Sequence, residues 1–497
     1  MVQLPDEIYL YILQCLPDLT GFTHKKEFED YRQTSILLAT ICRTSRFLRT
    51  FAEPLLYRAY IEDEEDCNRR RSGEADECTR LQLFLRTLIR RPDLAVKVEY
   101  LKLADCLDHP DAKWYCPFGE LFVKASEKLL SIYASLPLDK AHWRRTCVWQ
   151  DDWKRRLRRI GTYQGAEVVL LLTLLPNLGS LDMYASERNT GLFVQMLCHD
   201  VVEAYSWKED TQVENGERIT VFKVLQSPSS SKLPFFSRLR TLTLAVGEGT
   251  PSMDMNFLKN IACIPSLESL CIEGDVTPFA FATPFRLPLQ HIRNLTLKEC
   301  TISDIYLRSI VESCGSLRSL RIKLPSYMKQ SDTYCNLQAL LKSLTPSFQT
   351  LEELQIYLSR GSSEHNNITP AECFDLRSFT KLRALEINME FLFASASDPE
   401  PSFTALLPTS IDDIYLRMAD KRFAKHLQVL AEEYKSFPNL KTLDIGIDDM
   451  PSIHAMDQAE MGWKMALNYC ARELRNGGIE CNVPVEGTHF NLSCGND

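Results

Sequence analysis

A recurring hexapeptide organises most of the chain: one apolar residue, two variable residues, a second apolar residue, one variable residue and a third apolar residue. It begins at Val98, Leu178, Leu239, Leu267, Ile292, Leu317, Leu351, Leu382, Ile411 and Leu440. From Leu239 onward, successive copies start 28, 25, 25, 34, 31, 29 and 29 residues apart. A period of roughly 20–50 residues is typical of repeat architectures, in which each repeat is one supersecondary unit.

Each repeat combines a strand pattern with a helix pattern. The last two apolar residues of the hexapeptide alternate with polar ones, which predicts a half-buried strand. Between strands we expect amphipathic helices, for example where Leu307, Val311 and Cys314 fall on one helical face. Because no unit can bury its apolar face alone, stacked units should place short parallel strands on a concave side and helices on a convex side.

One repeat carries a family signature. The segment from Leu295 to Ile322 resembles a cysteine-containing leucine-rich repeat, with Cys300 and Cys314 at the two cysteine positions of that repeat. The other units vary in length and lack these cysteines. Residues 80–497 therefore resemble a divergent leucine-rich repeat solenoid, an α/β fold, with an insertion at 104–166. A generic α/β core is the alternative interpretation of the apolar stripes.

The first 58 residues do not follow the repeat and predict about three short helices. Pro5 suits the first position of a helix, and Ile8 and Ile12 begin an apolar stripe along it. A polar stretch at 17–35 should interrupt the helices before a second apolar-periodic stretch begins. A helical module this small is marginal alone and should pack on the rest of the chain or on a partner.

The same residues resemble an F-box. The residues Leu4, Pro5, Ile8 and Ile12 match the family's opening pattern, and 37–43 and 51–58 match its middle and its end. The whole chain resembles fungal-type F-box proteins with C-terminal leucine-rich repeats. The resemblance implies a three-helix F-box-like module at 1–58 whose Leu4, Pro5, Ile8 and Ile12 bind a Skp-family adaptor and, through it, a cullin. Alternatively, these helices only cap the solenoid, since terminal caps are a physical requirement.

Three segments connect or interrupt these modules. The charged block at 59–79 reads as a solvated linker. The insertion at 104–166 includes Trp143, Trp149 and Trp153 and a basic run at 154–159, a mixture that can contact nucleic acid. Leu157 favours an amphipathic helix whose charges face water instead, so we expect no nucleic-acid partner. A chain break or ordered loop is expected at 205–235, around a serine-rich run.

Composition limits the classes of partner and the cellular compartment that we expect. The 57 Lys and Arg against 66 Asp and Glu give a net charge of −9, which disfavours a general nucleic-acid binder. The longest apolar run, Val168–Leu175, is far shorter than the roughly 20 residues a spanning helix needs, so no membrane partner is expected. Seventeen cysteines include no C-x-x-C pair, and many lie in periodic segments. This usage is typical of reduced thiols in an intracellular protein, cytoplasmic or nuclear.

Catalytic signatures do not occur in the sequence. It contains no P-loop, G-x-G-x-x-G, G-x-S-x-G or H-E-x-x-H motif, and its nine histidines are widely spaced. We therefore expect no catalytic residue, no cofactor and no metal site.

The strand residues that alternate with the buried leucines should face the concave side. Stacked in order, their middle positions are Asp182, Thr243, Cys271, Thr296, Arg321, Gln355, Glu386, Tyr415 and Asp444, and positions two residues on include Lys298, Lys323, Tyr357, Asn388 and Arg417. The candidate target-binding residues are Lys298, Arg321, Lys323, Tyr357, Glu386 and Tyr415. Arg and Tyr are favoured binding anchors, and Arg321 and Lys323 should attract an acidic or phosphorylated segment. Alternatively, these are ordinary solvated strand positions.

The function predicted by the resemblance is that of a substrate-recognition subunit of an SCF-type ubiquitin ligase, without catalysis of its own. Its F-box would bind the adaptor, and its repeats would bind an unknown target protein. One alternative is a leucine-rich repeat scaffold or regulator outside ubiquitination. Another is an unrecognised enzyme, which predicts a concave pocket of convergent polar groups with perturbed pKa values.

Overall fold

The computed structural model describes most of the repeat region and part of the N-terminal module. The described residues are 25–62, 80–103, 117–134, 154, 157–158, 164–184, 205–214, 217–226, 236–245, 253–254, 257–262, 264–274, 276–277, 284–300, 302, 304–325, 337–358, 375–392, 402–417, 423–446 and 458–482. The residues expected to bind an adaptor, Leu4, Pro5, Ile8 and Ile12, lie outside them.

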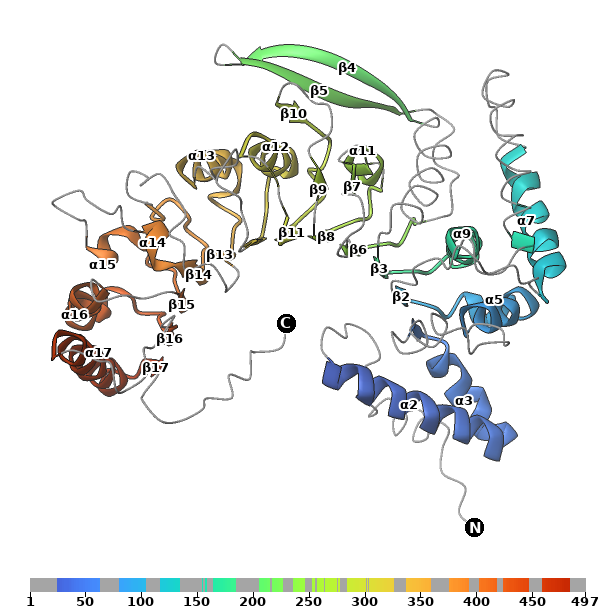
Figure 1. Cartoon of the computed structure of the whole chain (residues 1–497), viewed down its shortest axis with the longest axis horizontal. Helices are drawn as coiled ribbons and strands as arrows, with labels where there is room; N and C mark the ends of the chain where they lie inside the picture. Colours follow the sequence, from blue (N-terminus) through green and yellow to red (C-terminus); the bar gives the residue numbers. More distant parts are fainter. Residues whose placement is uncertain are drawn as a thin grey trace.

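A parallel sheet of twelve strands runs through the described chain, so the chain is a mixed α/β protein. In sheet order its strands are β1 (Ala59–Ile61), β2 (Tyr100–Leu103), β3 (Ser180–Tyr184), β6 (Thr241–Ala245), β8 (Ser269–Glu273), β11 (Asn294–Lys298), β12 (Ser319–Leu324), β13 (Glu353–Leu358), β14 (Ala384–Asn388), β15 (Asp413–Arg417), β16 (Thr442–Ile445) and β17 (Glu480–Asn482). The sheet follows chain order and curves into an open arc, with the strands on its inner side (Figure 1).

Helices cover the outer side of the arc (Figure 1). They are α5 (Arg80–Arg90), α6 (Pro92–Ala95), α7 (Gly119–Ala134), α9 (Gln164–Thr173), α11 (Phe257–Ile261), α12 (Asp304–Cys314), α13 (Leu337–Ser343), α14 (Met389–Leu392), α15 (Phe403–Leu406), α16 (Phe423–Glu433) and α17 (Gln458–Asn476), with 3-10 turns at Thr345–Ser347 and Tyr434–Ser436. The predicted helical face of α12 is confirmed, since Leu307, Val311 and Cys314 are all buried.

The hexapeptide forms the core as the sequence predicts. In the unit that contains β12, Leu317, Leu320 and Ile322 are all buried, and the positions between them stay partly exposed. Equivalent residues of the other units join them in one continuous apolar core that extends from Leu81 to Cys481. The core thus lies between the sheet and the outer helices, and each unit supplies one layer of it.

Small hydroxyl residues join neighbouring units at the turns. Ser266, Thr350 and Ser410 each precede the first apolar residue of a hexapeptide. Their hydroxyls donate hydrogen bonds of 2.9, 2.7 and 2.8 Å to the carbonyls of Leu239, Leu317 and Leu382 in the previous units. Each carbonyl belongs to the leucine at the equivalent position one unit earlier. The Ser or Thr before the hexapeptide therefore forms part of the turn and also links two neighbouring units by a hydrogen bond.

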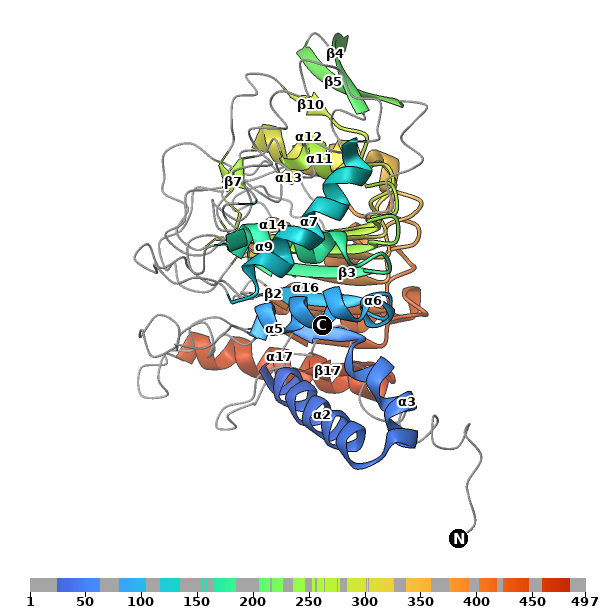
Figure 2. The same cartoon turned by 90° about the vertical axis from the view of Figure 1, so that its right-hand side faces the viewer.

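The helices α2 (Lys25–Thr44) and α3 (Arg46–Leu56) lie beyond β1, at one end of the sheet (Figures 1 and 2). Their small apolar cluster includes Leu38 and Ala52 and is closed by residues of β1 and β2. The Tyr31 hydroxyl donates a 3.1 Å hydrogen bond to the carbonyl of Ala59. The N-terminal helices are therefore packed on the sheet through its first strands.

Two sequence expectations for this end of the chain need correction. The polar stretch at 17–35 does not interrupt the helices throughout, because α2 already begins at Lys25. Helix α2 forms despite its polar residues because one of its faces carries Leu38 and the partly buried Tyr31 and Ile41. These three side chains belong to the apolar cluster described above. The segment expected as a linker from residue 59 begins with strand β1, whose backbone pairs in register with β2.

The loop expected at 205–235 also differs. Residues 205–226 contain an antiparallel hairpin of β4 (Tyr205–Glu214) and β5 (Glu217–Gln226), which pairs with β10 (Phe285–Arg286) on the outer side of the arc (Figure 1). A further pair, β7 (Met253–Asp254) and β9 (Val276–Thr277), forms a separate two-stranded parallel sheet. The serine-rich run that prompted the expectation lies outside the described residues.

The insertion at 104–166 contributes helix α7 to the outer layer. Leu157 is fully buried in the main core, as expected if the basic run lies on an amphipathic helix with its charges in water. Two cations of that run bond acidic residues of α7: Lys154 with Glu127 at 3.3 Å and Arg158 with Glu120 at 3.1 Å. These charges are therefore engaged within the protein.

Candidate interaction surface

The inner face of the sheet presents the side chains that alternate with the buried leucines. Backbone register places its middle positions in one row: Lys102, Asp182, Thr243, Cys271, Thr296, Arg321, Gln355, Glu386, Tyr415, Asp444 and Asn482. The order predicted from the hexapeptides is confirmed and extends by one strand at each end. A second row consists of the residues two positions after these in each strand. It contains Lys298, Lys323 and Tyr357 on adjacent strands.

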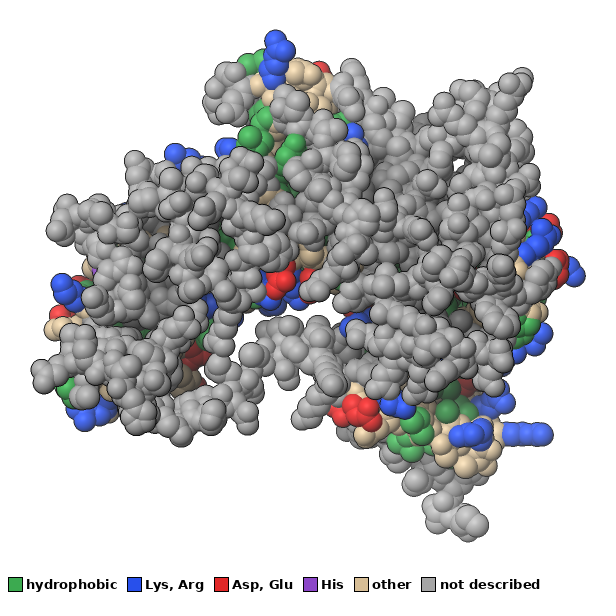
Figure 3. All heavy atoms as spheres, viewed as in Figure 1, with side chains coloured by type: hydrophobic (Ala, Val, Ile, Leu, Met, Phe, Trp, Pro, Cys, Tyr) green, Lys and Arg blue, Asp and Glu red, His purple; other side chains and the backbone are tan. Residues whose placement is uncertain are grey.

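Carboxylates neutralise the cations expected to form a basic cluster. Arg321 bonds Glu353 at 2.9 Å and Lys323 bonds Glu299 at 2.5 Å. Lys298 lies 3.9 Å from Glu273. The three cations do stand together on β11 and β12, but each has an acidic partner on an adjacent strand or directly after it. Figure 3 shows basic and acidic side chains next to one another along the inner rim of the arc.

Sequence reasoning did not single out these acidic partners. Glu353 lies two residues before Gln355, and the period of two therefore places it on the same face, next to Arg321. Glu299 follows β11 with a left-handed φ of 55°, where the equivalent residue after β8 is Gly274 with φ 95°. This unusual conformation of a non-glycine residue occurs where its carboxylate engages Lys323.

An aromatic and cationic cluster lies next to these ion pairs. The Arg417 guanidinium carbon lies 4.0 Å from the centre of the Tyr357 ring and 5.1 Å from that of Tyr415. The same guanidinium is ion-paired with Glu386. Strands β13, β14 and β15 each supply part of this tyrosine–arginine cluster, defined as Tyr357, Glu386, Tyr415 and Arg417. Parallel pairing brings these residues together although 60 positions separate the first from the last.

Burial shifts the titration of several inner-face groups. It raises the pKa of the Cys271 thiol to about 11, which keeps that sulfur protonated near neutral pH. Burial also raises the pKa of Asp182, against the opposing influence of Lys102. Asp444, which accepts a 2.7 Å hydrogen bond from the Asn482 amide, has its pKa raised by burial and by the nearby Glu480 and Asp413 carboxylates.

Within the described residues, no group of three or more His, Cys, Asp or Glu is placed to hold a metal. Among the helices described, none combines the length and apolar character needed to cross a bilayer. No family model and no curated protein matches the chain.

Proposed function

We propose that the chain is the substrate-recognition subunit of an SCF-type ubiquitin ligase, with a leucine-rich repeat solenoid that binds the target on its inner face. Residues 1–58 would bind a Skp-family adaptor and, through it, a cullin. Ubiquitin transfer would then be accelerated by proximity, because the bound target's lysine is held at a high effective concentration beside the charged conjugating enzyme.

The observation that carries the target-binding half is the tyrosine–arginine cluster. Tyr and Arg are the side chains most enriched among residues that dominate binding energy. The Arg417 guanidinium contacts both tyrosine rings, at 4.0 Å and 5.1 Å from their centres, and is ion-paired with Glu386. A side chain that is already ordered loses little conformational entropy on binding, so this cluster is a pre-organised anchor.

Ion pairing changes the role proposed for the basic residues. An acidic segment that contacts Arg321 and Lys323 would first displace Glu353 and Glu299. Both pairs are only partly exposed, and ion pairs at a protein surface contribute roughly 0.2–1 kcal/mol each, so displacement is feasible but reduces the affinity gained. We therefore assign the main anchoring role to the tyrosine–arginine cluster, and a secondary role to Lys298, Arg321 and Lys323.

Exposed apolar side chains on α2 and α3 support the adaptor-binding half. Ile36, Leu37 and Phe47 are 58, 46 and 38 % exposed, which is unusual for three large apolar residues within about a dozen positions. They belong to the segment that resembles an F-box. Burying one such side chain in an interface contributes roughly 1.5–3 kcal/mol, so a partner that covers them together gains a substantial affinity.

The adaptor-binding half is tested by affinity purification of the tagged full-length protein from cells, followed by mass spectrometry. Wild type should bring down a Skp-family adaptor and a cullin, whereas Ile8→Asp and Ile36→Asp should lose both. Ile305→Asp is the matched control, because Ile305 is 46 % exposed on the distant helix α12. Absence of adaptor and cullin from the wild-type sample would refute the ligase function and favour the scaffold alternative.

The target-binding half is tested on the same complexes. Tyr357→Ala and Tyr415→Ala should deplete one set of co-purifying proteins and lengthen their cellular half-lives, while adaptor recovery stays unchanged. Arg321→Glu with Lys323→Glu should have a smaller effect in the same direction. Tyr469→Ala is the control, since Tyr469 is 58 % exposed on the outer helix α17. Equal effects of Tyr469→Ala and Tyr357→Ala would exclude the inner face as the recognition surface.

A further inference from the structure

A polar hollow opens at the amino edge of the sheet, the edge at which the parallel strands begin. Its volume is about 410 Å³, and its charged and amide side chains are Glu352, Lys381, Arg383, Asp412, Asn439 and Lys441. They come from the turns that lead into β13, β14, β15 and β16. The hollow therefore lies on a different surface from the inner-face row and is independent of the proposed function.

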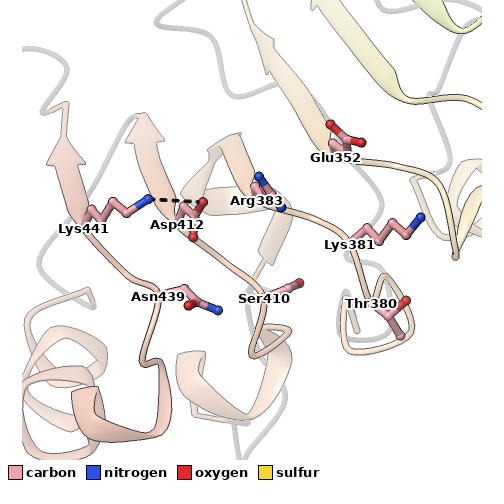
Figure 4. A pocket seen from close by; sticks show the side chains of 8 residues that line it. All are labelled: Glu352, Thr380, Lys381, Arg383, Ser410, Asp412, Asn439 and Lys441. Atoms are coloured by element: carbon pink, nitrogen blue, oxygen red, sulfur yellow. Dashed lines mark ion pairs between the residues drawn. The ribbon is translucent and has the colours of Figure 1, made fainter.

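Backbone hydrogen bonds hold these turns in a fixed row. The N–H of Arg383 donates to the carbonyl of Glu352 at 2.8 Å, that of Asp412 to Arg383 at 2.7 Å, and that of Lys441 to Asp412 at 2.7 Å. In the row, Arg383 stands between Asp412 and Glu352, with Lys441 beyond Asp412 and Lys381 on the other side of Arg383 (Figure 4). These backbone hydrogen bonds fix the turns relative to one another, and with them the positions of the residues that line the hollow.

The charges of this row do not cancel. Glu352 is engaged from outside the hollow by Arg318, whose Nε lies 2.9 Å from its carboxylate. Asp412 is engaged by Lys441 at 3.6 Å. Within the described part of the chain, Arg383 and Lys381 have no ion-pair partner, and the Asn439 amide makes no hydrogen bond. Among the described residues, the hollow therefore presents two positive charges without an ion-pair partner and one amide without a hydrogen bond.

We propose that this hollow binds a phosphate group, with Arg383 and Lys381 as its principal ligands and the Asn439 amide as a further donor. A phosphate monoester carries about −1.5 to −2 charge near neutral pH, which matches the two cations in excess. The planar guanidinium of Arg383 can donate two parallel hydrogen bonds to phosphate oxygens, and Lys381 supplies a point charge. The group can belong to a phosphorylated side chain of a bound protein or to free phosphate, since both present the same oxygens.

Isothermal titration of the full-length protein tests the site, with two probes at constant ionic strength. The probes are inorganic phosphate and N-acetyl-phosphoserine methylamide. We expect saturable binding of at least one, weakened about tenfold or more by Arg383→Gln or by Lys381→Gln, because each removes a charge-assisted contact. Tighter binding of the phosphoserine compound would identify a protein-borne group, and equal or tighter binding of phosphate would identify the free anion.

Matched controls separate this site from general electrostatic attraction. Arg240 occupies the same position of an earlier turn on the amino edge and is exposed, so Arg240→Gln removes the same charge away from the hollow. It should leave both affinities unchanged. Thermal melts of the variants should match wild type, because the substituted side chains are exposed. Failure of both probes to bind, or an equal loss on Arg240→Gln and Arg383→Gln, would overturn the proposal.

Discussion

Replacing Ser347 by Ala should weaken the contact between two repeat units more than any other single hydroxyl deletion nearby. Ser347 is buried in the turn before β13, and its hydroxyl accepts the N–H of Leu317 at 2.9 Å and donates to the carbonyl of Gly315 at 2.6 Å. Two buried hydrogen bonds contribute about 1 kcal/mol each. The Leu317 N–H keeps a second contact with the Gly315 carbonyl at 3.2 Å, so it is not left entirely unpaired. The expected loss is therefore about 2 kcal/mol, rather than the larger penalty of an orphaned donor.

Ser343→Ala is the matched comparison. Ser343 is also buried, but its hydroxyl donates only to the Leu340 carbonyl one turn earlier, which also accepts the Leu344 N–H at 3.2 Å. Its removal should cost less than about 1 kcal/mol, because no buried partner is left unpaired. Urea unfolding gives the overall effect, and hydrogen exchange of the Leu317 amide gives the local one, which matters because long repeat arrays can depart from two-state unfolding. If Ser343→Ala proves as costly as Ser347→Ala, the bridging role of Ser347 is wrong.

Three further predictions follow from burial and titration. Burial raises the pKa of the Cys314 and Cys481 thiols to about 12, so neither should react with iodoacetamide at pH 8 in the folded protein, and labelling that precedes unfolding would contradict this. Because burial raises the pKa of Asp444 above its ordinary value of 3.8, the folded state binds the proton more tightly than the unfolded chain and ionisation costs stability. Asp444→Asn should therefore raise the urea midpoint at pH 7, and this gain should shrink as pH falls through the raised pKa towards about 4; an equal gain at pH 3 and pH 7 would exclude ionisation as the cause. Tyr31→Phe should lower stability by about 1 kcal/mol and expose α2 to limited proteolysis, because the hydrogen bond to Ala59 is lost; unchanged cleavage would show that this bond does not hold the helix.

The sequence alone determined where most strands lie and which way their side chains point. An apolar residue at every second position, as in Leu320 and Ile322, can be buried only if the segment is extended and one face meets a core. Similar spacing then required equivalent positions to stack, which is why Arg321 and Gln355 stand side by side as predicted. Both inferences rest on local periodicity, which needs no knowledge of distant residues.

Tertiary structure decided which side chains pair across strands and which strands form the two ends of the sheet. The sequence does not state that Arg321 meets Glu353, because Glu353 lies opposite Ser319 in the register and only its side-chain conformation in the folded chain brings its carboxylate to Arg321. Strands β1 and β17 lack the full hexapeptide and form because a neighbouring strand offers its backbone groups, as in the pairing of Ala59 with Tyr100. The hollow at the amino edge exists only because the turns before four successive strands stack, which brings Lys381 and Lys441 to one surface although 60 positions separate them.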